Sequence, residues 1–434
     1  MDAHSSAPLR IAPPVLVALC VVAAIVGSLW TAWDMFGAHR RSMLQGWDDS
    51  FYYFWLPSVV IDHDVDFSNQ VTHGGTLPPS AQDDAFAQPL TPAGLMPNKY
   101  PPGWALGSLP FFLLAHAVAP AGATGFESGY LLAVWLGQLL YAAAGLWLAV
   151  KIVGRYFPEP IASVAVLAIW LASPLLYYQT SRLFMSHSQV FVLTMAVFWL
   201  ALRIHDGDTR ARFWLLLGLG GAALVITRNL ATVYLIFPAV VLVRRLRSLA
   251  ALGWLMLGAA GPLVVQLIAW KLLFGSWLIY SYGGERFDFT HLHLAEVLFS
   301  PRHGWFYWHP LLLIALVPFI ARSVRSIEGR AWLASLGAIV LLNAAWPMWW
   351  LGSSFGQRGF EAATFFAMLG FAWWLRASAT RAFWRRLLIG VTAAAIVWNA
   401  LLFALFLSQR ISREEPVTYV AAVRALAGWI GDSR

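Results

Sequence analysis

Long apolar runs, separated by short polar loops, dominate the chain from end to end. Twelve such runs stand out, and most approach the ~20 residues that a helix needs to cross the ~30 Å hydrocarbon core of a membrane. They cover residues 11–33, 104–118, 128–150, 160–178, 184–204, 211–227, 230–244, 250–273, 308–321, 331–350, 361–376 and 385–408. The pattern therefore predicts an all-α polytopic membrane protein.

Basic residues are concentrated in alternate loops between these runs. Five short loops carry several lysines or arginines each, and such loops remain in the cytoplasm. They hold Lys151 and Arg155, then Arg203, Arg210 and Arg212, then Arg244, Arg245 and Arg247, then Arg322, Arg325 and Arg330, and finally Arg376, Arg381, Arg385 and Arg386. The short loops in between carry one basic residue each, Arg182, Arg228 or Arg358, and are expected on the external side.

The stretch Trp104 to Val118 does not fit a full crossing. As a helix it would be roughly 22 Å long, and Pro110 interrupts it. If Arg10 keeps the N-terminus in the cytoplasm, both ends of the region around this stretch lie outside, so we expect an interfacial or re-entrant helix here. We expect about eleven spans in one transmembrane domain, residues 1–408, with large external loops at 34–127 and 274–307 and a short external C-terminal tail, residues 409–434.

Composition agrees with this class of protein. The chain of 434 residues is 59% hydrophobic and only 12% charged, with a mean hydropathy of +0.65. Its net charge of +8 is accounted for by the basic cytoplasmic loops, so it does not indicate nucleic-acid binding. The single cysteine, Cys20, excludes an internal disulfide and a cysteine metal cluster.

Two adjacent carboxylates, Asp48 and Asp49, follow the first apolar run within Gly46 to Tyr53. Carboxylates at a membrane boundary are expensive, so a pair beside aromatic residues is a candidate site. The alternative is a solvated turn or helix start, where aspartate is common. Lys99 stands before Pro101 and Pro102, which hold it at the start of the short helix. It can bind phosphate, or it can be an interfacial lysine with its ammonium in water.

Further polar residues fall on the same external side. They are His187 near Arg182, Arg228 between two short helices, Arg302 and His303 in the aromatic loop 274–309, and Arg358 and Glu361 after a glycine-rich turn. An arginine inside a broken helical hairpin tends to line a polar cavity. Glu361 alternatively complements a helix dipole. His291 and His293 form only a weak metal-binding pattern.

Five short motifs, taken together and in their order along the chain, resemble motifs of the GT-C superfamily of integral-membrane glycosyltransferases. The resemblance is closest to the bacterial protein O-mannosyltransferases and lipid A aminoarabinose transferases, and it covers about residues 46–376. The motifs are the acidic pair with tyrosine at Asp48 to Tyr52, the acidic stretch Ile61 to Asn69, the lysine-proline segment Lys99 to Pro102 with Tyr100 inserted, Leu298 to Gly304, and Ser354 to Arg358. Two features depart from the family: His187 stands where relatives often carry a second aspartate, and the large soluble C-terminal domain of some members is absent.

The resemblance implies sugar transfer from a polyprenyl-phosphate donor to a hydroxyl of a lipid, glycan or protein, on the periplasmic face of a bacterial inner membrane. Asp48 would be the general base, and Asp49 would orient it or help to hold a Mg²⁺ or Mn²⁺ ion. Lys99, Arg228, Arg358 and Arg302 are the candidates for binding the donor phosphate. Tyr52, His187, Tyr100, His303 and Glu361 are the candidates for the remaining substrate contacts. We expect a monomer with its N-terminus in the cytoplasm and its C-terminus in the periplasm.

Two other functions compete with transfer. A lipid flippase or transporter would also use buried arginines and carboxylates, but near the bilayer midplane in broken helices. Here the acidic residues cluster at the outer boundary, which disfavours transport. A scaffold subunit would leave the Asp48 to Tyr52 motif without a role.

Overall fold

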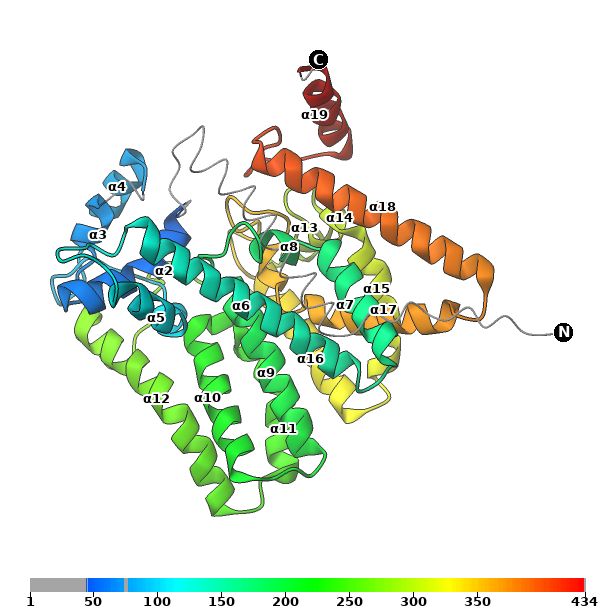
Figure 1. Ribbon diagram of the computed structural model, residues 1–434, viewed down its shortest axis with the longest axis horizontal. Helices are drawn as coiled ribbons and strands as arrows, with labels where there is room; N and C mark the ends of the chain where they lie inside the picture. The colour runs from blue at the N-terminus through cyan, green and yellow to red at the C-terminus, as the bar shows by residue number, and fades with distance from the viewer. Residues whose placement is uncertain (1–43, 45, 74–76, 433–434) are drawn as a thin grey trace. The chain divides into compact units, whose positions relative to one another are not determined.

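The computed structural model describes residues 44, 46–73 and 77–432, and all regular structure among them is helical (Figure 1). This confirms the predicted all-α class. The first predicted span, residues 11–33, lies outside the described residues, as do Arg10 and Cys20.

The chain forms two compact units, each built from separate segments. The first unit contains the described residues of Ala24–Gly145 together with Tyr178–Arg286. The second unit contains Leu146–Tyr177 together with the described residues of Phe287–Arg434. The divisions fall inside two helices, α6 (Ser128–Val153) and α8 (Leu175–Tyr178).

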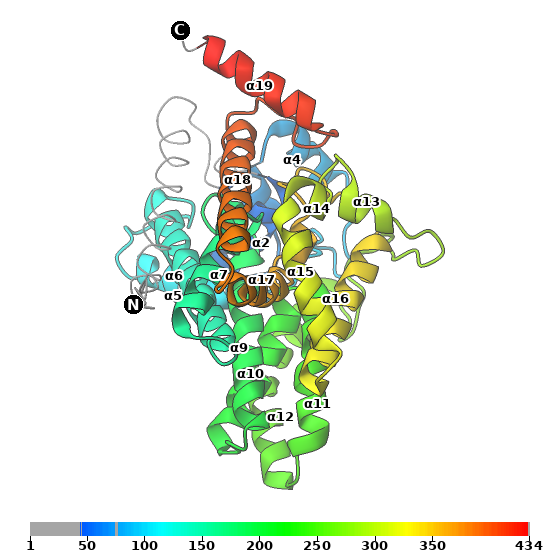
Figure 2. The same cartoon turned by 90° about the vertical axis from the view of Figure 1, so that its right-hand side faces the viewer.

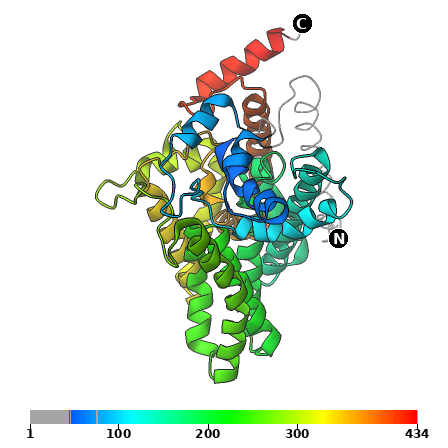
Figure 3. The ribbon, with the colours of Figure 1, turned by 90° about the vertical axis from the view of Figure 1, so that its left-hand side faces the viewer.

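Helices of very different length make up the first unit. Its N-terminal part holds four short helices and one π-helical turn, which Figure 3 shows in blue and cyan: α2 (Trp47–Pro57), η2 (Ser58–Asp62), α3 (Ser68–Thr72), α4 (Pro79–Phe86) and α5 (Gly103–His116). The remainder is α6 up to Gly145, α9 (His187–His205), α10 (Ala211–Thr227), the 3₁₀ helix η3 (Asn229–Leu235), α11 (Ile236–Arg245) and α12 (Leu249–Phe274).

The regular structure among the described residues of the second unit is helical as well. Figure 2 shows α13 to α16 of this unit in yellow and yellow-green. Besides the end of α6 and most of α8, it contains α7 (Glu159–Leu171), α13 (Leu294–Phe299), α14 (Trp305–Trp308), α15 (Pro310–Ser323), α16 (Ile327–Ala344), η4 (Arg358–Phe360), α17 (Thr364–Ser378), α18 (Ala382–Leu407) and α19 (Tyr419–Asp432).

Five of the described helices, α6, α9, α12, α16 and α18, are long and apolar enough to cross a membrane. The chain is thus a multi-pass membrane protein, while the count of eleven spans stays a prediction. Some predicted spans are interrupted: the run 230–244 becomes η3 followed by α11, and the two together would extend over roughly 29 Å. The stretch predicted to be too short, 104–118, forms α5, a helix of 14 residues that includes Pro110.

Two glycines let α10 and α12 of the first unit approach each other closely. In the first unit, a Cβ atom on Gly218 of α10 would lie 1.9 Å from the Leu255 carbonyl oxygen of α12, and one on Gly258 would lie 1.9 Å from the Leu215 oxygen. The two glycines therefore bring α10 and α12 into backbone contact, as is common between membrane helices. Figure 1 shows these helices in green, with α9 beside α10.

The acidic stretch Ile61 to Asn69 folds back on itself. Asp64 accepts a hydrogen bond from the Ser58 hydroxyl at 2.9 Å, and Asp66 accepts one from the Ser68 backbone N–H at 3.2 Å. Asp62 accepts from Asn69 at 3.0 Å and also from Gln70. These carboxylates hold the turn after η2 and the start of α3, so they shape the loop that follows α2.

Candidate active site

The adjacent aspartates of α2 lie in two different environments. Asp49 is 1% exposed, and its Oδ1 accepts a hydrogen bond from Nη2 of Arg182 at 2.9 Å. Asp48 is partly exposed and accepts a hydrogen bond from the hydroxyl of Tyr100. Consecutive helical residues point about 100° apart, which explains the separation. Asp49 is thus part of a buried ion pair, and Asp48 faces a more open region.

Tyr52 shares the side of α2 on which Asp48 lies. One turn after Asp48, its ring centroid lies 4.7 Å from that of Tyr100, the tyrosine that donates to Asp48. Residues four apart in a helix lie on one face, so Asp48 and Tyr52 are expected to face the same region. Both side chains meet Tyr100, in agreement with that expectation.

The segment carrying Tyr100 is fastened to α2 by side-chain-to-backbone hydrogen bonds. Asn98 Nδ2 donates to the Phe51 oxygen at 2.9 Å, and Trp55 Nε1 donates to the Tyr100 oxygen at 3.1 Å. Burial raises the pKa of the Tyr100 phenol well above its ordinary value, and the nearby Asp48 charge raises it further. The phenol therefore stays protonated at neutral pH and acts as a donor to Asp48.

Arg228 reaches this region because of a close contact between α5 and α10. A Cβ atom on Gly103, the first residue of α5, would lie 2.4 Å from the Ile226 and Thr227 backbone at the end of α10. Arg228 follows directly, and its Nη1 lies 3.4 Å from Nδ1 of His187. The sequence placed Arg228 between two short helices. The structure adds that Gly103 lets this bend approach the lysine-proline segment.

Tyr282 interacts electrostatically with both Asp48 and Arg228. Burial raises the pKa of this phenol, Tyr52 and Asp48 raise it further, and Arg228 opposes the shift. These electrostatic interactions show that Tyr282 lies near all three side chains. In the sequence it could not be distinguished from the other aromatic residues of its loop, because an interfacial aromatic belt explains them equally well.

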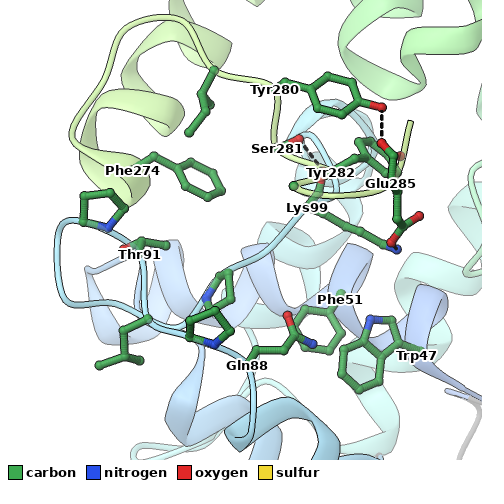
Figure 4. A pocket seen from close by; sticks show the side chains of 16 residues that line it. Trp47, Phe51, Gln88, Thr91, Lys99, Phe274, Tyr280, Ser281, Tyr282 and Glu285 are labelled. Atoms are coloured by element: carbon green, nitrogen blue, oxygen red, sulfur yellow. Dashed lines mark hydrogen bonds and ion pairs between the residues drawn. The ribbon is translucent and has the colours of Figure 1, made fainter. Parts of the chain in front are cut away.

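Lys99 lies beside Tyr100 and Tyr282. Its Nζ forms an ion pair with Glu285 (Figure 4). The ammonium lies 5.8 Å from the ring centroid of Tyr100 and 5.4 Å from that of Tyr282. The two charged side chains are 30% and 46% exposed, so the pair contributes little stability. Sequence reasoning missed Glu285, which is 186 residues away along the chain.

His187 and Arg182 complete the charged region of the first unit. The ring of His187 is 1% exposed and lies 4.2 Å from that of Tyr178, centroid to centroid. Arg182 is the partner of Asp49, a role that the sequence did not assign. The only sequence signal for it was one arginine in a short external loop.

Two candidates of the second unit, Arg302 and His303, contact main-chain oxygens. Arg302 Nε donates to the Glu414 oxygen at 2.6 Å, and its guanidinium lies 4.0 Å from the ring centroid of Trp350. His303 is fully buried, and its Nδ1 lies 2.8 Å from the Trp350 oxygen. Burial lowers the pKa of His303 to about 4, and Arg302 and Arg358 also lower it. His303 is therefore neutral at pH 7 and donates Nδ1–H to that carbonyl.

The glycine-rich turn before Glu361 is shaped by packing within the second unit. A Cβ atom on Gly359 would lie 1.9 Å from Oδ1 of Asn343, and one on Gly356 would lie 2.5 Å from Nε2 of His309. The close contacts of these two glycines are therefore internal to the second unit. Arg358 begins η4, and Glu361, which is 4% exposed, follows it.

The predicted site residues are thus divided between the units. Asp48, Asp49, Tyr52, Lys99, Tyr100, His187 and Arg228 belong to the first unit, and Arg302, His303, Arg358 and Glu361 belong to the second. Among residues of the first unit, contacts and electrostatic interactions connect Asp48, Tyr52, Lys99, Tyr100 and Arg228. Convergence of Arg358 on Lys99 and Arg228 stays a prediction.

The aspartate pair does not by itself form a good cation site. Within the described ranges, no three histidine, cysteine, aspartate or glutamate side chains come together as metal ligands. Asp49 faces the guanidinium of Arg182, and a dication prefers several oxygen ligands. Nδ1 of His291 lies 3.0 Å from Oδ2 of Asp288, and the ring of His293 packs near that of Trp349.

No family model matches the chain, and no curated protein matches it. Among solved structures, it is similar to the crystal structure of ArnT from Cupriavidus metallidurans in the apo state, with a TM-score of 0.48 and 15% sequence identity. The alignment covers 96% of this chain and 75% of ArnT. ArnT is an aminoarabinose transferase of the GT-C family. A likeness at this identity and TM-score carries no argument, so the case for a function rests on the residues described above.

Proposed function

We propose that this protein transfers a sugar from a polyprenyl-phosphate donor to an acceptor hydroxyl at the periplasmic side of a bacterial inner membrane. The observation that carries the proposal is the position of Asp48. It is a partly exposed carboxylate beside three tyrosines, with Lys99 and Arg228 on the neighbouring segments. A base, aromatic surfaces and phosphate-binding cations within one unit are the groups that this reaction needs.

Asp48 acts as the general base in this proposal. As the acceptor oxygen attacks the anomeric carbon, its proton passes to the Asp48 carboxylate. The bond between the anomeric carbon and the donor phosphate breaks, and polyprenyl phosphate leaves with the electron pair. The Tyr100 hydroxyl holds the carboxylate in place through its hydrogen bond, without taking the proton itself.

Cationic side chains stabilise the departing phosphate. Lys99 has three N–H donors, so one bond to Glu285 leaves others for a phosphate oxygen. Arg228 supplies a planar guanidinium, which suits phosphate oxygens geometrically. His187, which lies beside Arg228, contacts the sugar in this proposal.

The proposal is tested by donor cleavage with the purified full-length chain. Polyprenyl-phosphate hexoses and pentoses are incubated with a cell-envelope extract, and free polyprenyl phosphate is measured by mass spectrometry. We expect release with at least one donor, and loss of that release in Asp48→Asn. Passage of an intact donor across proteoliposomes without cleavage would favour a flippase instead.

The side of the membrane is tested separately. Ser80 in α4 is exposed and belongs to the loop that we place in the periplasm. Ser80→Cys should react with an impermeant maleimide in whole cells. Labelling only after lysis would place the site on the cytoplasmic side.

A further inference from the structure

A pocket of about 410 Å³ lies in the first unit beside Lys99 (Figure 4). Its walls come from the loop segment 88–99 and the segment 274–285 after α12, with Trp47 and Phe51 of α2 also lining it. The volume lies within the ~300–1,000 Å³ typical of small-molecule sites. None of the roles assigned above uses this space as a whole.

Aromatic rings form much of the pocket. Trp47 stacks on Phe51 with ring centroids 4.7 Å apart and planes 23° apart, so Phe51 supports the indole from one side. Tyr280 and Tyr282 line the pocket as a second aromatic pair, 6.0 Å apart. A flat ligand with an apolar face and a polar edge fits such walls, and a sugar ring has this form.

The polar edge of the pocket carries no net charge. Lys99 and Glu285 contribute opposite charges and pair with each other, and Gln88 and Thr91 add neutral hydrogen-bonding groups. A strongly anionic ligand would meet the Glu285 carboxylate, and an acyl chain would desolvate an ion pair without replacing its hydrogen bonds. A neutral ligand with several hydroxyls satisfies both charges.

A peptide fits this pocket less well. Three prolines, Pro89, Pro92 and Pro97, lie along its loop wall and have no N–H to donate. An extended peptide that binds by strand pairing needs such donors from the wall. The pocket therefore favours a ligand recognised through hydroxyl groups and an apolar ring face.

The pocket shares two side chains with the catalytic region. Lys99 and Tyr282 line it, and Tyr282 also lies within electrostatic reach of Asp48. We propose that this pocket is an acceptor subsite that binds a neutral sugar ring, with Trp47 as its stacking platform and Glu285 as a specificity-determining residue. This rests on the proposed function, and it makes the acceptor a glycan or a glycolipid headgroup.

Binding to immobilised glycans tests the subsite without any donor. The full-length protein in detergent is applied to neutral oligomannose and glucan oligosaccharides, to oligoglucuronate and to mannose 6-phosphate. We expect binding to at least one neutral glycan, and a loss of apparent affinity of about tenfold in Trp47→Ala. Trp47→Phe keeps an aromatic face and should stay within about threefold of the wild type.

Trp277→Ala is the matched control. This tryptophan lies on the same segment, is 57% exposed and does not line the pocket, so its removal should leave glycan binding unchanged. Glu285→Gln removes one negative charge from the edge and should raise binding of oligoglucuronate about fivefold relative to neutral glycans. The subsite is overturned if the wild type binds no neutral glycan, prefers the acidic or phosphorylated glycans, or is insensitive to Trp47→Ala.

Failure of the subsite differs from failure of the transferase. Glycan binding that depends on Trp47, with no donor cleaved, would support the pocket and reject transfer. Cleavage that depends on Asp48 but not on Trp47 would support transfer and reject the pocket.

Discussion

The two units treat their polar candidates in opposite ways. In the first unit, Asp48 meets Tyr100, Asp49 meets Arg182, and Lys99 meets Glu285, so side chains from distant segments contact one another. In the second unit, Arg302 and His303 contact backbone oxygens of Glu414 and Trp350. Side-chain pairs can exchange a partner for substrate, whereas side chains bonded to backbone hold loops in place. The comparison assigns chemistry to the first unit and loop structure to these two residues of the second.

Among the changes that test this comparison, Asp48→Asn should have the largest effect, a loss of transfer rate. Asparagine keeps the shape and can still accept the Tyr100 hydrogen bond, but it cannot take a proton. Loss of a general base costs ~10² to 10⁴ in rate, so transfer should fall by that range while protein yield and donor binding persist. Initial rates of polyprenyl phosphate release measure this, with donor binding measured on the same samples.

Asp49→Asn should primarily affect stability. Asp49 and Arg182 are largely buried, at 1% and 10% side-chain exposure, and breaking such a pair costs about 3 kcal/mol because one charge stays buried. Thermal unfolding in detergent should show a clear loss, and the surviving folded protein should retain more specific activity than Asp48→Asn. A stable but inactive Asp49→Asn, beside an active Asp48→Asn, would reverse the two roles. In that case, a response of the wild-type rate to chelator and to added Mg²⁺ or Mn²⁺ would indicate a cation at Asp49.

Arg228→Ala should weaken donor use by roughly 10- to 100-fold in KM, the range for losing a charge-assisted hydrogen bond of ~1.5–3 kcal/mol. Arg410→Ala is the control, because this arginine lies in the C-terminal tail near Trp429. Arg358→Ala sharpens the comparison of the units. An equal loss in Arg358→Ala would bring the second unit into the donor site, and a normal KM would remove Arg358 from it.

The smallest expected effect concerns the pH dependence of the second unit. The pKa of His303 is about 4 when folded and ~6.5 in an unfolded chain, so the unfolded state binds more protons at low pH. This contribution is complete above pH 6.5 and is lost as the pH falls towards 4. Between pH 7.5 and 5.5 the loss should be about 1 kcal/mol. Thermal melts of the wild type and His303→Gln across this range measure it, and parallel curves would contradict it.

Local sequence features predicted much of the fold. Apolar runs predicted the helical class and the long helices α6, α12 and α18, because burial in hydrocarbon requires such runs. Pro110 and the short length of its run predicted that α5 is no ordinary span. Breaks such as η3 were harder to place, because bundle neighbours and not local propensity decide where a membrane helix is interrupted.

Sequence order alone determined that Asp48, Tyr52, Lys99 and Arg228 are candidates and that Asp48 and Tyr52 share a helix face, since helical periodicity is a local property. Only the tertiary structure decided that Asp49 is paired with Arg182, that Tyr100 donates to Asp48, and that Glu285 joins Lys99. These partners are 52 to 186 residues apart. Which side chain each carboxylate meets depends on which distant segments pack against α2, and no local pattern of residues encodes that packing.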